Sequence, residues 1–333
     1  MKTICTAMGL AAAAIAAGTV SARAEEAAKP LTVVIDNYAT YDDAGALVSN
    51  HELDFTLEGT AGAWTLGAEA WFGVMAEYAT STLTLEIPTL LLYAKSDAFG
   101  EIDAWDASNA LGNACVTPPG GSTHFGSEDL MAFGTCAGYS GQALTYITPD
   151  FFDGFGLQVS VMKDLEGQTA AGEVDSSVSA ALTYTRTTET DVTYSASLGV
   201  DAATSLNGGV PAGTALPVTV QGGGSVGWDG WTVGGAAQYE FASLSGGNSW
   251  GLGLGVSKDV TEQLTLGAEL AIDGYEDAAA AVIYREFSLG TTAEYKILDN
   301  ASIDAGLNAI RVIGDDGSDT ISWQIGTGLS ISF

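Results

Sequence analysis

Alternation of apolar and polar residues, in segments of about ten, constrains this chain more than any other feature. The C-terminal segment TISWQIGTGLSISF puts its large apolar side chains on odd-numbered positions, from Ile321 to Phe333. The even-numbered positions hold Ser, Gln and Gly. Because successive side chains of a strand point to opposite faces, this period of two predicts β-strands with one apolar face and one small, polar face.

The same period recurs along the chain, whereas helical periodicity is scarce. Apolar residues alternate with small or polar ones in GNSWGLGLGVSKD, EQLTLGAELAID, GWTVGGAAQYEF and ELDFTLEG. A water-soluble sandwich alternates too, so alternation alone leaves two fold classes open. Short breaks such as Asp229-Gly230 are interspersed with longer acidic ones such as 314–319. Tight turns at one rim and longer loops at the other are typical of a membrane barrel.

The spacing of aromatic residues also favours a membrane barrel. On apolar faces they recur near strand ends, as in Trp64 and Phe72, or Phe287 and Tyr295. At about 3.3 Å per residue and a tilt of about 40°, this spacing climbs roughly 20–25 Å, close to the height of the apolar band between aromatic girdles. We therefore predict strands that cross a bilayer.

Sixteen strands are predicted, which gives an all-β, antiparallel transmembrane β-barrel with both termini at one rim. Residues 282–297 keep one parity throughout and are taken as one strand. The sheet has to close, because open edges are not tolerated in lipid. Sixteen strands leave an aqueous channel, so we interpret the small inner residues as facing water. The predicted strands are 31–39, 51–60, 63–75, 81–87, 89–96, 139–148, 154–163, 174–187, 190–201, 217–228, 230–242, 249–258, 263–273, 282–297, 301–313 and 320–333.

The N-terminal segment predicts export. MKTICTAMGLAAAAIAAGTVSARAEE combines an early Lys with a short apolar run and an Ala-x-Ala cleavage site, so residues 1–24 are interpreted as a signal peptide and 25–333 as one barrel. The formal net charge of −31 argues against nucleic acid as a partner. An exported chain with two remaining cysteines, Cys115 and Cys136, favours a disulfide over two free thiols.

Residues 98–137 form the longest stretch without a sustained strand pattern. An insert of this length is uncommon unless it has a function. It follows the fifth predicted strand, with Lys95 at its root, and we predict that it folds into the barrel rather than lying outside. A bridge between its two cysteines would stiffen it. It carries the acidic residues Glu101, Asp103, Asp106, Glu128 and Asp129.

Local features resemble the Gram-negative general porin family. They are the turn around Pro149, Phe152, Gly154 and Phe155, the long insert after strand five, and the closing strand that ends on Phe333. The resemblance implies an outer-membrane location in contact with lipid, a homotrimer, and a constriction made by the insert. It also implies that the terminal Phe is a signal to the barrel-assembly machinery.

One departure from that family concerns charge. General porins set an acidic loop against a basic wall, whereas this chain has few basic residues to supply one. Parity directs acidic side chains inward instead, and rings of Asp and Glu favour cations. With the insert acids and Lys95, the predicted pore lining includes Asp54, Glu69 and Glu86. The other inward acids are Glu52, Glu58, Glu240, Glu269 and Asp304.

Passive diffusion of small hydrophilic solutes, with a preference for cations, is therefore the predicted function. A closed structural or adhesive barrel is one alternative, and a substrate-specific porin is another, although Trp71 alone makes no aromatic ladder. We predict no enzyme and no catalytic residues, because neither His51 nor His124 has a place in a lumen-facing triad. No cofactor is expected, apart from the weaker hypothesis of Ca²⁺ on loop carboxylates.

Overall fold

The computed structural model describes residues 31–42, 47–77, 82–85, 89–105, 108–120, 142–163, 174–208, 215–242, 247–276 and 282–333. Its strands are β1 (Thr32–Asp42), β2 (Leu47–Ala61), β3 (Trp64–Glu77), β4 (Thr82–Leu85), β5 (Thr89–Ser96), β6 (Gly100–Trp105), β7 (Gln142–Ile147), β8 (Phe155–Lys163), β9 (Val174–Thr187), β10 (Thr193–Leu206), β11 (Val218–Trp228), β12 (Trp231–Phe241), β13 (Asn248–Asp259), β14 (Leu264–Glu276), β15 (Val282–Leu298), β16 (Ala301–Gly314) and β17 (Asp319–Ser332). One short helix, α2, spans Ala110–Asn113. Within these residues no helix is both long and apolar enough to cross a bilayer.

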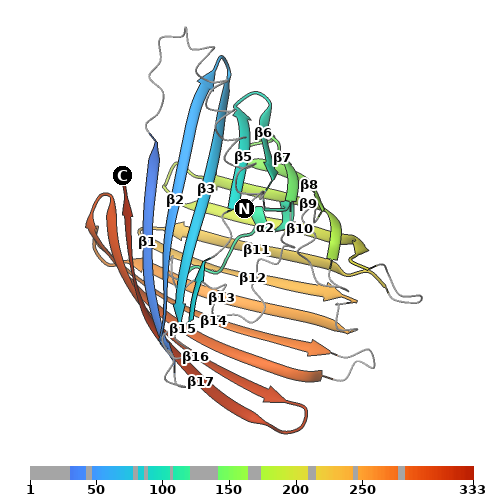
Figure 1. Ribbon diagram of the computed structural model, residues 1–333, viewed down its shortest axis with the longest axis vertical. Helices are drawn as coiled ribbons and strands as arrows, with labels where there is room; N and C mark the ends of the chain where they lie inside the picture. The colour runs from blue at the N-terminus through green and yellow to red at the C-terminus, as the bar shows by residue number, and fades with distance from the viewer. Residues whose placement is uncertain are drawn as a thin grey trace.

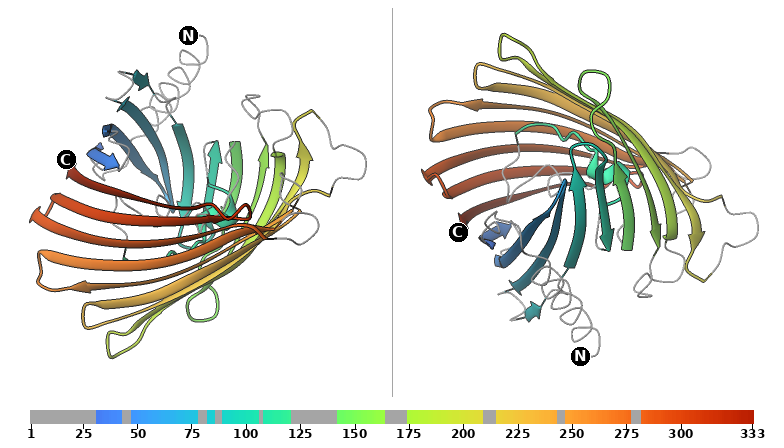
Figure 2. Two further views of the ribbon diagram at one scale, coloured as in Figure 1. Left: turned by 90° about the horizontal axis from the view of Figure 1, so that it is seen from below. Right: turned by 90° about the horizontal axis from the view of Figure 1, so that it is seen from above.

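The strands form one closed antiparallel sheet (Figures 1 and 2). Consecutive strands pair with each other, except that β4 and β5 both pair with β3. The sheet closes where β1 pairs with β17, with Val34 opposite Ser332. The backbone of Phe333 exchanges two hydrogen bonds with Val33, at 3.2 and 2.8 Å. The two ends of the sheet therefore meet at one rim, which confirms the predicted closure.

The barrel wall consists of sixteen strands, as predicted. Two errors in the strand assignment cancel in that count. β4 and β5 both pair with β3, at Val74–Glu77 and Thr65–Trp71 respectively, so they are two parts of one wall strand. β6 pairs with β5 and β7 and was not predicted. Residues predicted as two strands form one, and residues predicted as insert supply the missing strand.

The two rims differ as the sequence predicts. At the rim that holds the chain ends, β11 and β12 are joined by Asp229 and Gly230 alone. Both have positive φ, 46° and 70°, as a two-residue hairpin turn requires. The opposite rim holds the longer connections, and that between β6 and β7 is the longest.

The distribution of apolar and polar side chains in this barrel is the reverse of that in a water-soluble protein. Leu254, Leu270 and Leu289 lie side by side on its outer face, each with more than half of its surface exposed. The inner face instead buries polar groups, and Thr145 and Asp201 are fully buried there. A soluble monomer rarely exposes so large an apolar surface, whereas lipid tails cover it in a membrane.

The register places the predicted girdle aromatics on the same outer face. Trp231 and Tyr239 share it with Val220 and Val233, and Phe287 pairs there with Ile272. Aromatic rings near the strand ends also contact one another: Tyr41 lies 6.1 Å from Trp323 between centroids. Aromatic side chains thus lie near both ends of the outward-facing apolar strands, as expected from their spacing.

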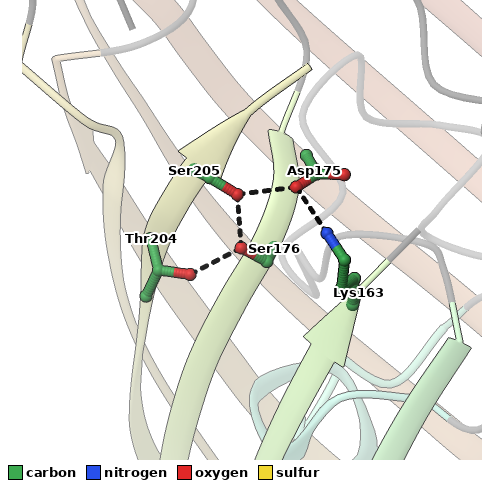
Figure 3. A network of polar contacts seen from close by, with 5 residues as sticks. All are labelled: Lys163, Asp175, Ser176, Thr204 and Ser205. Carbon is green, nitrogen blue, oxygen red and sulfur yellow. Dashed lines mark hydrogen bonds and ion pairs between the residues drawn. The ribbon is translucent and has the colours of Figure 1, made fainter. Parts of the chain in front are cut away.

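A polar network fastens the ends of β8, β9 and β10 at the rim of long loops (Figure 3). Asp175 Oδ2 accepts hydrogen bonds from Lys163 Nζ at 2.9 Å and from Ser205 Oγ at 2.7 Å. Ser176 Oγ lies 2.5 Å from Ser205 Oγ and 2.7 Å from Thr204 Oγ1. These contacts accompany a register shift in β10 around Ser205.

Candidate functional site

Beyond β6, the described part of the insert is residues 108–120, which lie against the inner face of the barrel (Figure 2). Thr145 of β7 donates a hydrogen bond to the carbonyl of Ser108 at 2.8 Å. The backbone N–H of Ala110 points at the hydroxyls of Ser160 and Ser179, at 2.9 and 3.0 Å. These contacts begin the path of the segment across the wall.

Asn109 is the main polar anchor of this segment. Its side chain, 2% exposed, caps α2 by accepting a hydrogen bond from Gly112 N at 2.8 Å. Its amide also donates to Asp201 Oδ2 on β10 at 2.8 Å, and Ser177 donates to the same oxygen at 3.2 Å. The Asn109 side chain thus caps the N-terminus of the helix and also attaches the helix to the wall.

Beyond α2, the segment crosses the strands from β11 to β14 at positions occupied by glycine. A Cβ on Gly223 would lie 2.4 Å from Val116 O, and one on Gly255 would lie 1.8 Å from Pro119 O. Gly120, the last described residue of this segment, accepts a hydrogen bond from Thr292 at 2.6 Å. The interpretation that small inner residues face water is therefore wrong at these glycines, because they make room for the chain.

The wall formed by β1, β2 and β3 carries acidic and aromatic side chains on its inner face. Glu52 accepts hydrogen bonds from Tyr38 Oη at 3.2 Å, from Asn50 Nδ2 at 2.8 Å and from Trp71 Nε1 at 3.3 Å. This network holds one carboxylate in place by three donors. Tyr38 and Asn50 were not singled out from sequence, although their parity matches that of Glu52.

Asp54 lies at the centre of a second group of acids. It faces inward on β2, next to Trp71 in the register. Its carboxyl group interacts electrostatically with the carboxyls of Asp36, Glu52 and Glu69. Like charges at this separation repel one another and attract cations from solution.

The acidic wall continues toward the rim of the chain ends. Tyr93 Oη and Lys95 Nζ both donate to Glu58 Oε1, at 2.6 and 3.0 Å. The ring of Tyr93 lies over Gly67, where any Cβ would collide with it at 2.0 Å. Asp103 pairs with Tyr93 in the register, and Glu101 pairs with Lys95.

The structure corrects the placement of two predicted insert acids. Glu101 and Asp103 belong to β6, a wall strand, because Ile102 and Ala104 alternate with them in a continuous ladder. The inward residues of this strand are acidic, so its sequence looks like that of a polar loop and the alternation is hard to recognise. Asp103 is 8% exposed and adjoins Thr145, the residue that holds the insert.

Several predictions fall outside the described residues. They concern the pore acids Glu86, Asp106, Glu128 and Asp129, together with Cys136 and residues 1–24. Cys115 is disulfide-bonded, and its pairing with Cys136 stays a prediction. The loop carboxylates proposed for Ca²⁺ stay untested, and the described residues contain no group of three or more His, Cys, Asp or Glu able to hold a metal.

His51 lies on the outer face of β2. Its Nδ1 is 2.7 Å from Asn37 Oδ1, and its register partners Asn37 and Val74 share the outward side. It is thus turned away from the lumen acids.

No protein-family model matches this chain, and neither does any curated protein. Solved structures do. OmpF of Salmonella typhi, in complex with daunomycin, matches with a TM-score of 0.65 at 11% identity, over 91% of this chain and 97% of its own. An anion-selective porin from Comamonas acidovorans matches with 0.58 at 14%, over 91% and 99%. OmpT of Vibrio cholerae, in a trimer form, matches with 0.63 at 12%, over 92% and 100%. The chain therefore has a porin-like barrel fold.

Proposed function

We propose that this protein is an outer-membrane channel for passive diffusion of small hydrophilic solutes, with a preference for cations. The acidic inner wall is the observation that carries the proposal. Rings of carboxylates lower the energy of cations in a pore and raise that of anions. The inward acids of this wall are Asp36, Glu52, Asp54, Glu58, Glu69, Glu101 and Asp103.

The fold does not decide the sign of the selectivity. A porin described as anion-selective shares this architecture, so the preference has to come from side chains. The described insert, Ser108–Gly120, contains no acidic residue. We therefore assign cation preference to the wall, and the insert acids Asp106, Glu128 and Asp129 to a supporting role.

The insert is proposed to narrow the channel. Residues 108–120 cover the wall from β7 to β15, so the path for solutes runs between them and the acids of β1 to β6. Thr145 lies between the insert and the acidic wall. It donates a hydrogen bond to Ser108 O and pairs with Asp103 in the register. The acids beside it would then face the narrowest part of the channel.

The location and partners follow from the fold as proposals. The apolar outer band supports insertion in lipid, and the porin-like fold supports the outer membrane of a Gram-negative cell, reached through the predicted signal peptide. A trimer form exists for OmpT of Vibrio cholerae, and we propose a homotrimer here. Phe333, paired with Val33 at the seam, is proposed as the signal to the barrel-assembly machinery.

A substrate-specific channel is the second candidate, because Tyr38 and Tyr93 join Trp71 on the inner wall. Aromatic faces beside carboxylates bind amino sugars and other organic cations. Titration of the current with glucosamine and with glucose separates the candidates. Saturable block by glucosamine would favour a specific channel, whereas proportional changes with both sugars would favour a general one.

Purified protein in planar bilayers tests the main proposal. We expect stepwise increases of conductance in KCl, and swelling of proteoliposomes at rates that fall with solute size. Liposomes made with detergent alone serve as the control. A folded barrel that gives neither conductance nor swelling would favour the closed structural barrel instead.

A further inference from the structure

Lys95 is the basic side chain embedded in the acidic wall. Its Nζ lies 3.0 Å from Glu58 Oε1 and 4.9 Å from the centroid of the Tyr93 ring. It also interacts electrostatically with Glu69 and Glu101. The side chain remains 44% exposed, so solvent reaches it. A cavity of about 440 Å³ at the rim of the chain ends is lined by both Lys95 and Glu101.

Other basic residues in the described part of the chain are arranged differently. Lys163 contacts Asp175 in the loop-rim network (Figure 3), and Arg186 contacts Asp153 at 2.7 Å. Arg311 pairs with Asp319 on the outer face, and Lys258 lies over the Trp231 ring. Lys296 has inward parity but lies at the end of β15. Lys95 alone among them is surrounded by inward carboxylates of three neighbouring strands.

The contacts of Lys95 are those expected of a bound cation. Its ammonium group contacts a carboxylate oxygen of Glu58 and lies over the aromatic face of Tyr93. Divalent ions such as Ca²⁺ take several oxygen ligands and bind carboxylate clusters far more tightly than K⁺ does. A pore conducts only if ions leave it readily, so a tightly bound divalent ion would reduce the flow of monovalent ones.

We propose that the ammonium group of Lys95 acts as a tethered counter-ion that keeps divalent cations from pairing with Glu58, in the field of Glu69, Glu101 and Asp103. This inference rests on the proposed channel function and assigns a specificity-determining residue to it. The ammonium group neutralises part of the local charge and occupies the position beside Glu58 Oε1. Monovalent cations then pass the wall without competition from bound Ca²⁺ or Mg²⁺.

Calcium block of the potassium current tests the inference. K95M and K95R would be compared with wild type in planar bilayers, at fixed KCl with CaCl₂ added in steps. We expect K95M to be half-blocked at about tenfold lower Ca²⁺, because the Glu58 carboxylate is released to the ion and one opposing charge is removed. K95R should behave as wild type, because it keeps the charge. K296M is the matched control and should leave the block unchanged.

A second variant keeps the test decisive if K95M folds poorly. E58Q removes the carboxylate that Lys95 contacts, and K95M/E58Q should return the half-blocking concentration toward the wild-type value. Equal Ca²⁺ sensitivity of conducting wild type and K95M would overturn the inference and leave the channel proposal intact. Absence of conductance in folded wild type would overturn the channel proposal, and the role of Lys95 with it.

Discussion

Glu269 shows how the inner wall holds charge at the scale of one residue. Its side chain is 5% exposed, and neither carboxylate oxygen has a hydrogen-bond partner among the described residues. It follows Ala268, whose backbone contacts the insert at Gly120. A carboxylate without partners is expensive to ionise in such a place. Glu269 therefore opposes, rather than supports, the folded state at neutral pH.

Replacing Glu269 by Gln should stabilise the barrel. E269Q keeps the shape of the side chain and removes the charge, so we expect the free energy of unfolding to rise by about 1–3 kcal/mol at neutral pH. Urea unfolding in detergent micelles measures the change. E262Q, in the exposed turn between β13 and β14, should change nothing. A loss of stability in E269Q would mean that the carboxylate is stabilised by an ion or water.

Parity predicts the inward direction of single side chains well, because it depends only on the alternation of a regular strand. Asp54, Glu69, Glu240 and Asp304 face inward as predicted. Partners are harder to predict. Neither Asn109 nor Asp201 stands out in the sequence, since their contact joins residues that are far apart in the chain.

At the scale of elements, the two errors in the strand assignment have separate causes. Pro88 falls between residues that keep strand alternation, and it cannot donate to a ladder, so its neighbours were predicted as two strands. β6 was missed because the alternate residues of GEIDAW are acidic and its length is only that of a short strand. Pairing with β3, and with β5 and β7, is non-local information that periodicity does not contain.

The contact between the insert and the glycines of the inner wall gives a prediction at the same scale. A methyl group on Gly255 would collide with Pro119 O, so G255A should displace the insert and lower the free energy of unfolding by about 1–3 kcal/mol. Denaturation midpoints in micelles measure this. G59A is the control, because a Cβ there meets nothing within 4 Å. If both variants unfold alike, the glycines of the inner wall have no role in seating the insert.

At the scale of the whole molecule, the outer and inner faces should respond oppositely to charge. L270R places a cation in the apolar outer row and should cost about 2–4 kcal/mol. T56R places the same side chain inward, opposite Glu69, and should fold normally. Unfolding in lipid vesicles compares the two. Equal destabilisation would contradict the assignment of the exposed leucines to lipid.

The architecture was predictable from the sequence because alternation, aromatic spacing and rim asymmetry all report on the same bilayer geometry. The course of the insert was not, although its entry into the barrel was expected. Its path depends on glycines from three different strands, Gly223, Gly255 and Gly267, meeting the backbone of residues 116–120. No local pattern encodes that meeting.

Reversal potential under a KCl gradient tests the central claim, that the acidic wall selects cations. Wild type would be compared with the wall variant E58Q/E69Q/E101Q/D103N and with D315N/D316N, which removes acids from the exposed turn between β16 and β17. We predict a cation-selective potential in wild type, nearly preserved in the turn variant and greatly reduced in the wall variant. An unchanged potential in the wall variant, or anion preference in wild type, would contradict the account.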